Sequence, residues 1–321
     1  MPVKTKYALT PGPATREAFG RALAELGREN KDVVVCDADL SKSTMTTYFQ
    51  KEFPERFFSC GIAEANMVAI GAGLAMAGKI PFVSSFSAFV VNKGFEQLRV
   101  CVAYPKVNLK VVGTHSGISI GEDGPSQMSL EETALACSLA GFVVMSPADE
   151  ASTKALVRAA AAHVGPVFIR TGRPKTPVIY DAGQKFEIGK AVEVVEGSDV
   201  AVIANGLLVA EAIRAAESLE SEGISVRVVD MHTVKPLDRE AIRRAAATGA
   251  IVVAEEHFVD GGLGVRVAQA VAEMSPCPME FVGIGDVYAE SGSPDELLDK
   301  YGMRAVNIAA AVKKVVSRKR S

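Results

Sequence analysis

The chain has 321 residues, more than one domain usually holds, so we expect two domains. Its 48% apolar and 23% charged residues are typical of a folded protein, and a net charge of -3 argues against a nucleic-acid binder, which needs a basic surface. The five cysteines form no CxxC pair and no apolar run reaches about 18 residues, so we expect a cytoplasmic protein without disulfides, a cysteine metal site or a membrane span.

Strand-length apolar runs alternate with helical patterns along the first half of the chain. Residues 15–26 carry apolar side chains at helical spacing, and residues 33–36 form a short run typical of a buried strand. This alternation predicts a mainly parallel sheet that helices cover on both faces. The expected helices are 15–26, one after Glu64, 88–103, 129–139 and 148–163, and the expected strands are 33–36, 81–86, 108–115, 142–145 and 167–170.

The pattern breaks between about 172 and 190, where prolines, glycines and polar residues are typical of a linker between domains. A second α/β series then begins. We expect two tandem doubly wound α/β domains, over residues 1–175 and 191–321, with a linker at 176–190. The expected strands of the second domain are 199–204, 226–230, 250–256 and 281–284, and its expected helices are 208–222, 238–247, 264–274 and 304–317.

Three polar segments follow strands of the first domain. They are residues 37–43, 84–89 and 114–127, and the last is a long, glycine-rich loop of a kind that is more often functional than not. Ligands of open parallel sheets bind beyond the carboxyl ends of the strands. The sequence therefore predicts that the chemistry lies at this edge of the first sheet.

Glu64 is an acid near the start of a helix that otherwise holds mostly small and apolar residues, in FFSCGIAEANMVAIGAGLAMAG. One interpretation is structural, since an acid in the first turn favours the helix dipole. The other is functional, because a carboxylate in an apolar setting has a raised pKa and can share a proton with the ring nitrogen of a bound heterocycle. The spacing alone leaves both interpretations open.

The segment GIAEANMVAIGAGLAMAG resembles the glutamate-bearing segment of thiamine-diphosphate enzymes of the transketolase group. The resemblance continues in order through FSAFVVNKGFEQLR, THSGISIGEDGPSQMSLEETALA, SPAD, IRTGRP, GSDVAVIANG, VVDMHTVKPLD and VVAEEH…GGLG, and so covers nearly the whole chain. It implies a pyrimidine-binding domain followed by a transketolase C-terminal domain. It also implies that Glu64 hydrogen-bonds the cofactor pyrimidine and so promotes loss of the thiazolium C2 proton.

The diphosphate-binding half of the same group carries GDG followed by Asn, and this chain contains no GDG. The resemblance therefore implies the C-terminal half of a transketolase encoded separately, inactive alone. A partner N-terminal subunit would supply the diphosphate and Mg2+ site. We expect an α2β2 assembly in which two copies of this chain meet around the cofactors, with no metal ligand on this chain.

The resemblance assigns several residues to the cofactor end of the site. Phe86 and Phe89 match aromatic residues of the pyrimidine pocket, Asn92 stands where many transketolases have a tyrosine of that pocket, and Asp39 matches an acid near the thiazolium end. Ser43 matches a serine that contacts the sugar phosphate. Each has a structural alternative, since phenylalanines usually belong to a core and Asp and Ser commonly cap helices and turns.

The resemblance assigns further residues to the substrate end. His115 matches a histidine that lies at the substrate phosphate and takes part in catalysis. Asp123 matches an acid that hydrogen-bonds the C2 hydroxyl of the sugar. Gln127 stands where transketolases with a DGPTH loop have a histidine that helps stabilise the C1 hydroxyl of the donor or the adduct. Arg170 matches the arginine that binds the acceptor phosphate, a role for which a guanidinium is well suited, and Arg173 is the alternative.

The function implied is transfer of a two-carbon ketol unit from a ketose phosphate to an aldose phosphate. One alternative is the β-subunit of a 2-oxo acid dehydrogenase, although GEDGP followed by a polar residue is the transketolase style of loop. A deoxyxylulose-phosphate-synthase-like half and a non-catalytic regulatory paralogue are the others. Glu64, Asp123, Phe86 and Phe89 argue against the paralogue.

Overall fold

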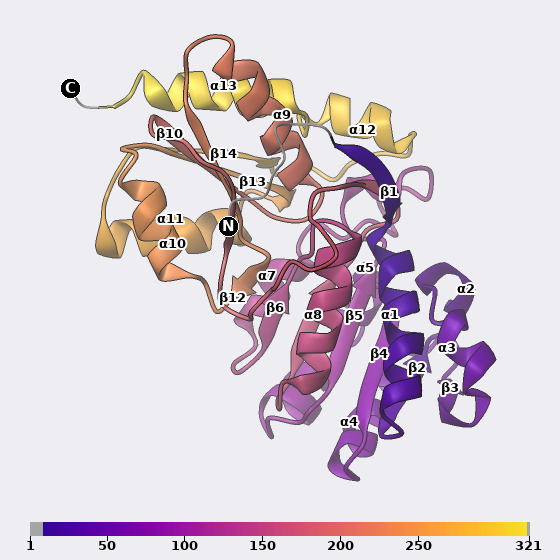
Figure 1. Cartoon of the computed structure of the whole chain (residues 1–321). Coiled ribbons are helices and arrows are strands. Elements are labelled where there is room, and N and C mark those ends of the chain that lie inside the picture. Colours follow the sequence, from indigo (N-terminus) through magenta and orange to yellow (C-terminus); the bar gives the residue numbers. More distant parts are fainter. Residues whose placement is uncertain (1–8, 320–321) are drawn as a thin grey trace.

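A computed structural model describes residues 9–319 of the chain. It contains two α/β layered units in sequence, each built on a mostly parallel sheet with helices on both faces, as Figure 1 shows. The predicted fold class is confirmed. Within the described residues, no helix combines the length and the apolar character that crossing a membrane requires.

The first sheet has seven strands in the order β12-β6-β7-β5-β4-β2-β3. Its neighbouring strands run parallel except β12, which pairs antiparallel with β6. The strands are rich in buried valine, isoleucine and phenylalanine because both faces of the sheet are covered. Their bounds are β2 Val33–Asp37, β3 Phe57–Ser59, β4 Ile80–Phe86, β5 Lys110–Thr114, β6 Val143–Met145, β7 Val167–Arg170 and β12 Thr233–Lys235.

The second sheet has five strands in the order β14-β13-β10-β11-β9. Only the edge strand β9 is antiparallel to its neighbour. A separate two-stranded antiparallel sheet joins β1 near the start of the chain to β8 after the first unit. The bounds are β9 Val192–Val195, β10 Val200–Ala204, β11 Val226–Asp230, β13 Ile251–Phe258, β14 Met279–Ile284, β1 Thr10–Ala14 and β8 Lys175–Val178.

Helices cover the first sheet from two sides. The helices α1, α3 and α8 pack on one face around Phe19, Phe49 and Leu156, and α1 and α8 lie side by side in Figure 1. The helices α4 and α7 and the π-helix η2 pack on the other face. The bounds are α1 Thr15–Glu29, α3 Thr47–Glu52, α4 Glu64–Met76, α7 Glu132–Ser138, α8 Glu150–Ala162 and η2 Leu98–Ala103, with short turns α2 Ser41–Thr44, η1 Pro54–Arg56 and η3 Ile118–Ile120.

The two units share one apolar core. Helices α10 and α11 cover one face of the second sheet, and the buried cluster there continues from Met231 and Val234 into the α4 and α7 side of the first sheet. Helices α9 and α13 cover the opposite face. The shared core fixes the second unit against the first. The bounds are α9 Leu208–Glu220, α10 Arg239–Ala246, α11 Leu263–Met274, α12 Pro294–Lys300 and α13 Ala305–Val316.

The continuous helix predicted over 88–103 is wrong. The segment forms α5 (Ser87–Val90), a turn, α6 (Phe95–Gln97) and then the π-helix η2. Gly94 lies at the break, where a Cβ would sit 2.5 Å from the carbonyl oxygen of Val90. The turn places Asn92 and Lys93 on the surface between the two pieces, next to the start of α4.

Candidate active site

Four strands of the first sheet end at the same edge, because they are parallel. The segments after β2, β4, β5 and β7 carry the predicted residues, and α4 begins directly after the loop that follows β3. This edge faces the second unit near the loop 114–127. The polar segments singled out in the sequence thus meet in one region.

Glu64 is the first residue of α4 and is only 3% exposed. Its position in the first turn suits an acid electrostatically, and its neighbours Met67 and Val68 are fully buried in the core. Among the described residues the carboxylate has one partner, the ammonium of Lys93, at 3.5 Å from Oε2. A nearly buried acid with such a distant partner is ready to accept a hydrogen bond from a ligand.

Two aromatic rings and a histidine form a row beside this acid. The rings of Phe89 and Phe86 are stacked with centroids 5.6 Å apart, and Phe86 in turn stacks on His115 at 3.9 Å. Phe86 and His115 are buried, whereas Phe89 is partly exposed. The row therefore leads from the surface beside Lys93 inward to the end of β5.

His115 has a strained backbone, with φ at +58°, directly after β5. Such conformations persist where the surroundings enforce them, and they are common at functional sites. The ring Nδ1 lies 2.9 Å from Thr114 Oγ1, and Nε2 lies 3.1 Å from Arg16 Nη1. Burial, followed by the positive charges of Arg16 and Arg173, lowers the pKa of His115 to about 3. The imidazole is therefore neutral, with Nε2 accepting from Arg16 and Nδ1–H donating to Thr114.

The neutral state of His115 predicts a pH dependence of stability. Its pKa is lower in the folded chain, at about 3, than the value of about 6.5 in an unfolded one, so the unfolded chain binds more protons between these values. Stability is expected to fall as pH drops below about 6.5 and to be independent of this residue above it. Between pH 7 and pH 5 the loss should be about 2 kcal/mol. Urea unfolding of His115→Gln should show a correspondingly smaller loss than the unaltered chain; an equal loss would contradict a neutral buried imidazole.

Arg16 lies among the predicted site residues although it was not predicted to be one of them. Its Nη1 donates to the carbonyl oxygen of Ser43 at 2.7 Å as well as facing His115, and its Nε is buried without a partner among the described residues. The nearby charge of Arg173 adds to burial in lowering the pKa of Arg16. Two neighbouring guanidinium groups are suited to bind an anion between them, and the Nε–H of Arg16 is a buried donor without a partner among the described residues.

Arg170, predicted to bind the acceptor phosphate, is engaged by other groups of the chain in this structure. This side chain is only 7% exposed, its Nε donates to Glu132 Oε1 at 2.6 Å and its Nη2 donates to the carbonyl oxygen of Glu256 at 2.7 Å. The guanidinium is thus buried at the contact between the two units, where Glu132 and Glu256 hold it. Arg173 lies in the following loop, and its side chain is one-third exposed. Its Nη1 donates to Glu122 Oε2 at 2.8 Å. Of the two arginines, Arg173 is the one beside His115.

Replacing Arg170 by Met is expected to destabilise the chain by about 3–5 kcal/mol, because Glu132 and Glu256 would remain buried without a cation. The midpoint of urea unfolding measures this effect. The double variant Arg170→Met with Glu132→Gln should recover part of the loss, since one buried charge is then removed too. Full stability of the single variant would show that the ion pairs contribute nothing.

The loop 114–127 is anchored on the second unit. Gly117, with φ at +83°, lies so close to Glu256 that a Cβ would sit 2.2 Å from the carboxylate. The backbone N–H of Ser119 donates to Glu256 Oε1 at 2.7 Å. Glu255 accepts from two N–H groups at the start of α11. Glu256 therefore holds the loop from the second unit, whereas Glu255 fixes the start of α11 within that unit.

The remaining predicted residues are more peripheral. Asp39 and Asp123 are exposed, and Asp39 has a φ of +64°, so it shares the backbone strain of His115. Gln127 is partly exposed and contacts Ser126. Among the described residues, Asn92 makes no hydrogen bond to Glu64. Its Nδ2 donates instead to Glu131 Oε1 at 2.5 Å.

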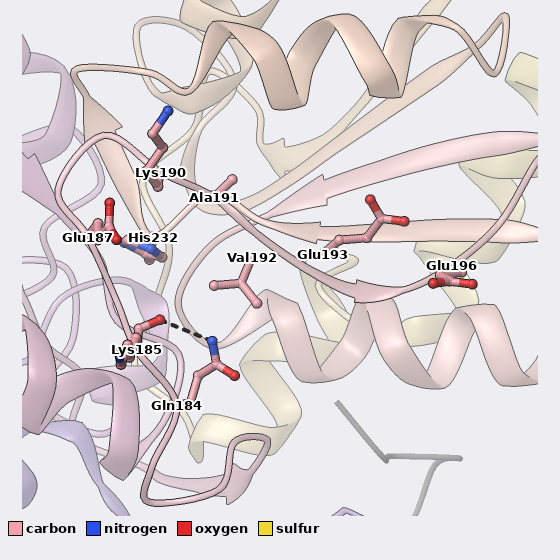
Figure 2. Close-up of a pocket in the computed structure, with 9 residues that line it drawn as sticks. All are labelled: Gln184, Lys185, Glu187, Lys190, Ala191, Val192, Glu193, Glu196 and His232. Carbon is pink, nitrogen blue, oxygen red and sulfur yellow. Dashed lines mark hydrogen bonds between the residues drawn. The ribbon is translucent and has the colours of Figure 1, made fainter. Parts of the chain in front are cut away.

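A separate hollow of about 490 Å³ lies between the linker and the second unit, shown in Figure 2. Its one histidine, His232, is buried with a pKa lowered to about 4 by burial, and its Nε2 has no partner among the described residues. The hollow contains none of the predicted site residues. It is lined by Gln184, Lys185, Glu187, Lys190, Ala191, Val192, Glu193, Glu196 and His232.

Comparisons with known proteins find matches for both units of the chain. Residues 11–178 match the pyrimidine-binding domain of transketolase, and residues 189–308 match the transketolase C-terminal domain. A protein of Methanocaldococcus jannaschii, provisionally described as a transketolase C-terminal section, is 44% identical over 92% of this chain and 94% of its own length. Transketolase-like protein 2 of Mus musculus is also 44% identical, over 97% of this chain but 50% of its own length.

A solved structure described as a split gene transketolase, inactive beta4 tetramer, is similar along the whole chain. It superposes with a TM-score of 0.91 at 48% identity and covers 96% of this chain and all of its own. The chain thus spans about half the length of the mouse relative and nearly the full length of the two shorter ones.

Proposed function

The chain belongs to the transketolase family, and we propose that it is the C-terminal subunit of a thiamine-diphosphate-dependent transketolase. With a second chain it would transfer a two-carbon ketol unit from a ketose phosphate to an aldose phosphate. One observation carries this proposal: the Lys93 ammonium links buried Glu64 to Phe89, and from Phe89 a row of contacts runs through Phe86 and His115 to Arg16. One chain thereby offers an acid for a heterocycle at one end and cations for a phosphate at the other.

The residues present fit the pyrimidine half of the cofactor. Glu64 offers a carboxylate that is nearly buried and has one distant partner within the described chain, and Phe86 and Phe89 offer an aromatic wall beside it. When bound, thiamine diphosphate supplies the electron sink needed to break and form the carbon–carbon bond next to a carbonyl. Glu64 would hold the pyrimidine ring nitrogen and exchange a proton with it.

The opposite end of the row would bind and orient the sugar phosphates. Arg16 and Arg173 would bind the phosphate as charged donors, with Ser43 beside them. His115, being neutral, would orient a substrate oxygen and position the guanidinium of Arg16. At the rim, Asp123 and Gln127 would contact the sugar hydroxyls. Asp39 would lie beside the thiazolium end of the cofactor. These roles make substrate length and the terminal anion the main determinants of specificity.

A partner chain would complete the site. Helix α4 is apolar on all sides, yet Ile70 and Met76 on it are 37% and 65% exposed, and Ile62 before it is 78% exposed. Helices of this kind are normally buried, so we infer that another chain covers this face. This chain has no GDG motif, and its described residues offer no group of three or more metal-ligating side chains. The partner would therefore hold the diphosphate and Mg2+, in an α2β2 assembly.

Reconstitution tests the proposal. The chain alone, an N-terminal subunit carrying GDG and Asn alone, and their mixture should be assayed with thiamine diphosphate, Mg2+ and a panel of phosphorylated ketoses and aldoses. Only the mixture is expected to form product, and the panel would identify the substrates. Turnover by this chain alone would contradict the shared site, and turnover of a 2-oxo acid instead of a ketose would favour the dehydrogenase alternative.

A further inference from the structure

Lys93 brings an ammonium group to the acid of the active site. The residue lies in the turn between α5 and α6, and its side chain is 52% exposed. Its Nζ nevertheless lies 3.5 Å from Glu64 Oε2 and 4.4 Å from the centroid of the Phe89 ring. One flexible, solvated side chain therefore reaches inward to contact both the carboxylate and an aromatic face.

These two contacts answer a physical need of the chain on its own. Glu64 is 3% exposed and has no other hydrogen-bond partner among residues 9–319. A carboxylate removed from water without a partner is costly, so a nearby cation stabilises it. The ring of Phe89 adds a cation–π attraction to the same ammonium.

The contacts are also easy to break. At 3.5 Å the distance from Nζ to Oε2 is at the outer limit of hydrogen bonding. Ion pairs of exposed side chains contribute little to stability, and ordering a lysine side chain costs conformational entropy. A ligand that donates a hydrogen bond to Glu64 and stacks on Phe89 could displace the ammonium into water at small cost.

We propose that Lys93 is a placeholder for the pyrimidine ring of thiamine diphosphate. It occupies the carboxylate and the aromatic ring that would receive the cofactor, and it would have to swing out for the cofactor to bind there. This inference rests on the proposed function. It adds that the chain stabilises its unpaired acid before assembly, and that cofactor affinity is reduced by the competition with Lys93.

The first test needs neither cofactor nor partner. A double-mutant cycle on the isolated full chain combines Lys93→Met with Glu64→Gln and follows the midpoint temperature of unfolding. Lys93→Met alone should lower the midpoint by about 2 °C, because Glu64 loses its partner, and should have no such effect when residue 64 is Gln. Lys79→Met, which removes another exposed lysine paired with Asp32, is the matched control and should not couple to Glu64→Gln. Absence of coupling at Lys93 overturns the proposal.

The second test measures cofactor binding to the reconstituted pair by titration calorimetry with thiamine diphosphate and Mg2+. Lys93→Met is expected to bind about three- to tenfold more tightly than the unaltered pair, since nothing has to be displaced. Equal or weaker binding overturns the proposal, and weaker binding would identify Lys93 as a cofactor ligand. If the unaltered pair binds no thiamine diphosphate, both the proposed function and the placeholder role fail, while the double-mutant cycle still reports whether the ion pair exists.

Discussion

Replacing Glu64 by Gln is expected to lower turnover of the reconstituted enzyme about 10²–10⁴-fold, the usual effect of removing a positioned acid or base. Gln keeps the shape and the hydrogen-bonding capacity of the side chain at a position that is 3% exposed, but it cannot exchange a proton. The fold should therefore survive, because Gln has nearly the same volume as Glu and leaves no cavity. Steady-state rates at saturating cofactor measure the loss, and circular dichroism confirms folding.

A matched control separates this effect from a general change in charge. Glu96 lies in α6 near the same surface, is 62% exposed in its side chain and pairs with Arg99 at 2.8 Å. Glu96→Gln should retain nearly full turnover. If Glu64→Gln did the same, the acid would be structural, stabilising the first turn of α4, and this chain would have no part in activating a cofactor.

Replacing Arg173 by Met is expected to raise the KM for a phosphorylated acceptor about 10–100-fold. Hydrogen bonds to charged groups contribute about 1.5–3 kcal/mol, which corresponds to that range. The KM for an unphosphorylated short aldehyde should be unchanged, since only the phosphate contact is removed. Comparing the two acceptors at fixed donor concentration provides the measurement.

Two further variants make the assignment specific. Arg21→Met removes an exposed arginine of α1 that pairs with Glu17 at 2.6 Å, and it should leave both KM values unchanged. Arg16→Met should resemble Arg173→Met, because Arg16 faces His115 from the same side. An equal loss with both acceptors in Arg173→Met would contradict a role in phosphate binding.

Much of the fold follows from the sequence because its strands are buried on both faces. Runs such as 33–36 and 200–204 are continuously apolar and bounded by polar turns, and each lies in an interior strand of its sheet. The strand Thr233–Lys235 was missed because it is three residues long and gains its stability by pairing with β6, far away in the chain. A sequence window cannot contain that pairing.

The break in the predicted helix 88–103 had a local signal in Gly94. A single glycine is tolerated in many helices, and here the chain turns at Gly94, between α5 on β4 and β5 and η2 on α4. This break matters for the site, because it creates the turn that carries Lys93. The lysine and its contact with Glu64 could therefore not be anticipated from a continuous helix.

The two arginines of IRTGRP show how far a site can be read from sequence. Arg170 ends β7 and faces the acids of the domain contact, whereas Arg173, three residues later, has left the strand and lies beside His115. Both suit a phosphate chemically, so only their surroundings distinguish them. Arg16 carries one signal in the sequence: a cation in the first turn of a helix opposes the helix dipole, which points to another role for it.

The central claim is that Glu64 exchanges a proton with a cofactor whose other half a second chain holds. The most direct measurement is the rate at which the C2 proton of thiamine diphosphate exchanges with deuterium from solvent, followed by proton NMR after acid quench. With both subunits present the rate should exceed that of free cofactor by at least about 10²-fold, and with either subunit alone it should stay near the free rate. Acceleration by this chain alone, or an unchanged rate in the pair after Glu64→Gln, would contradict the claim.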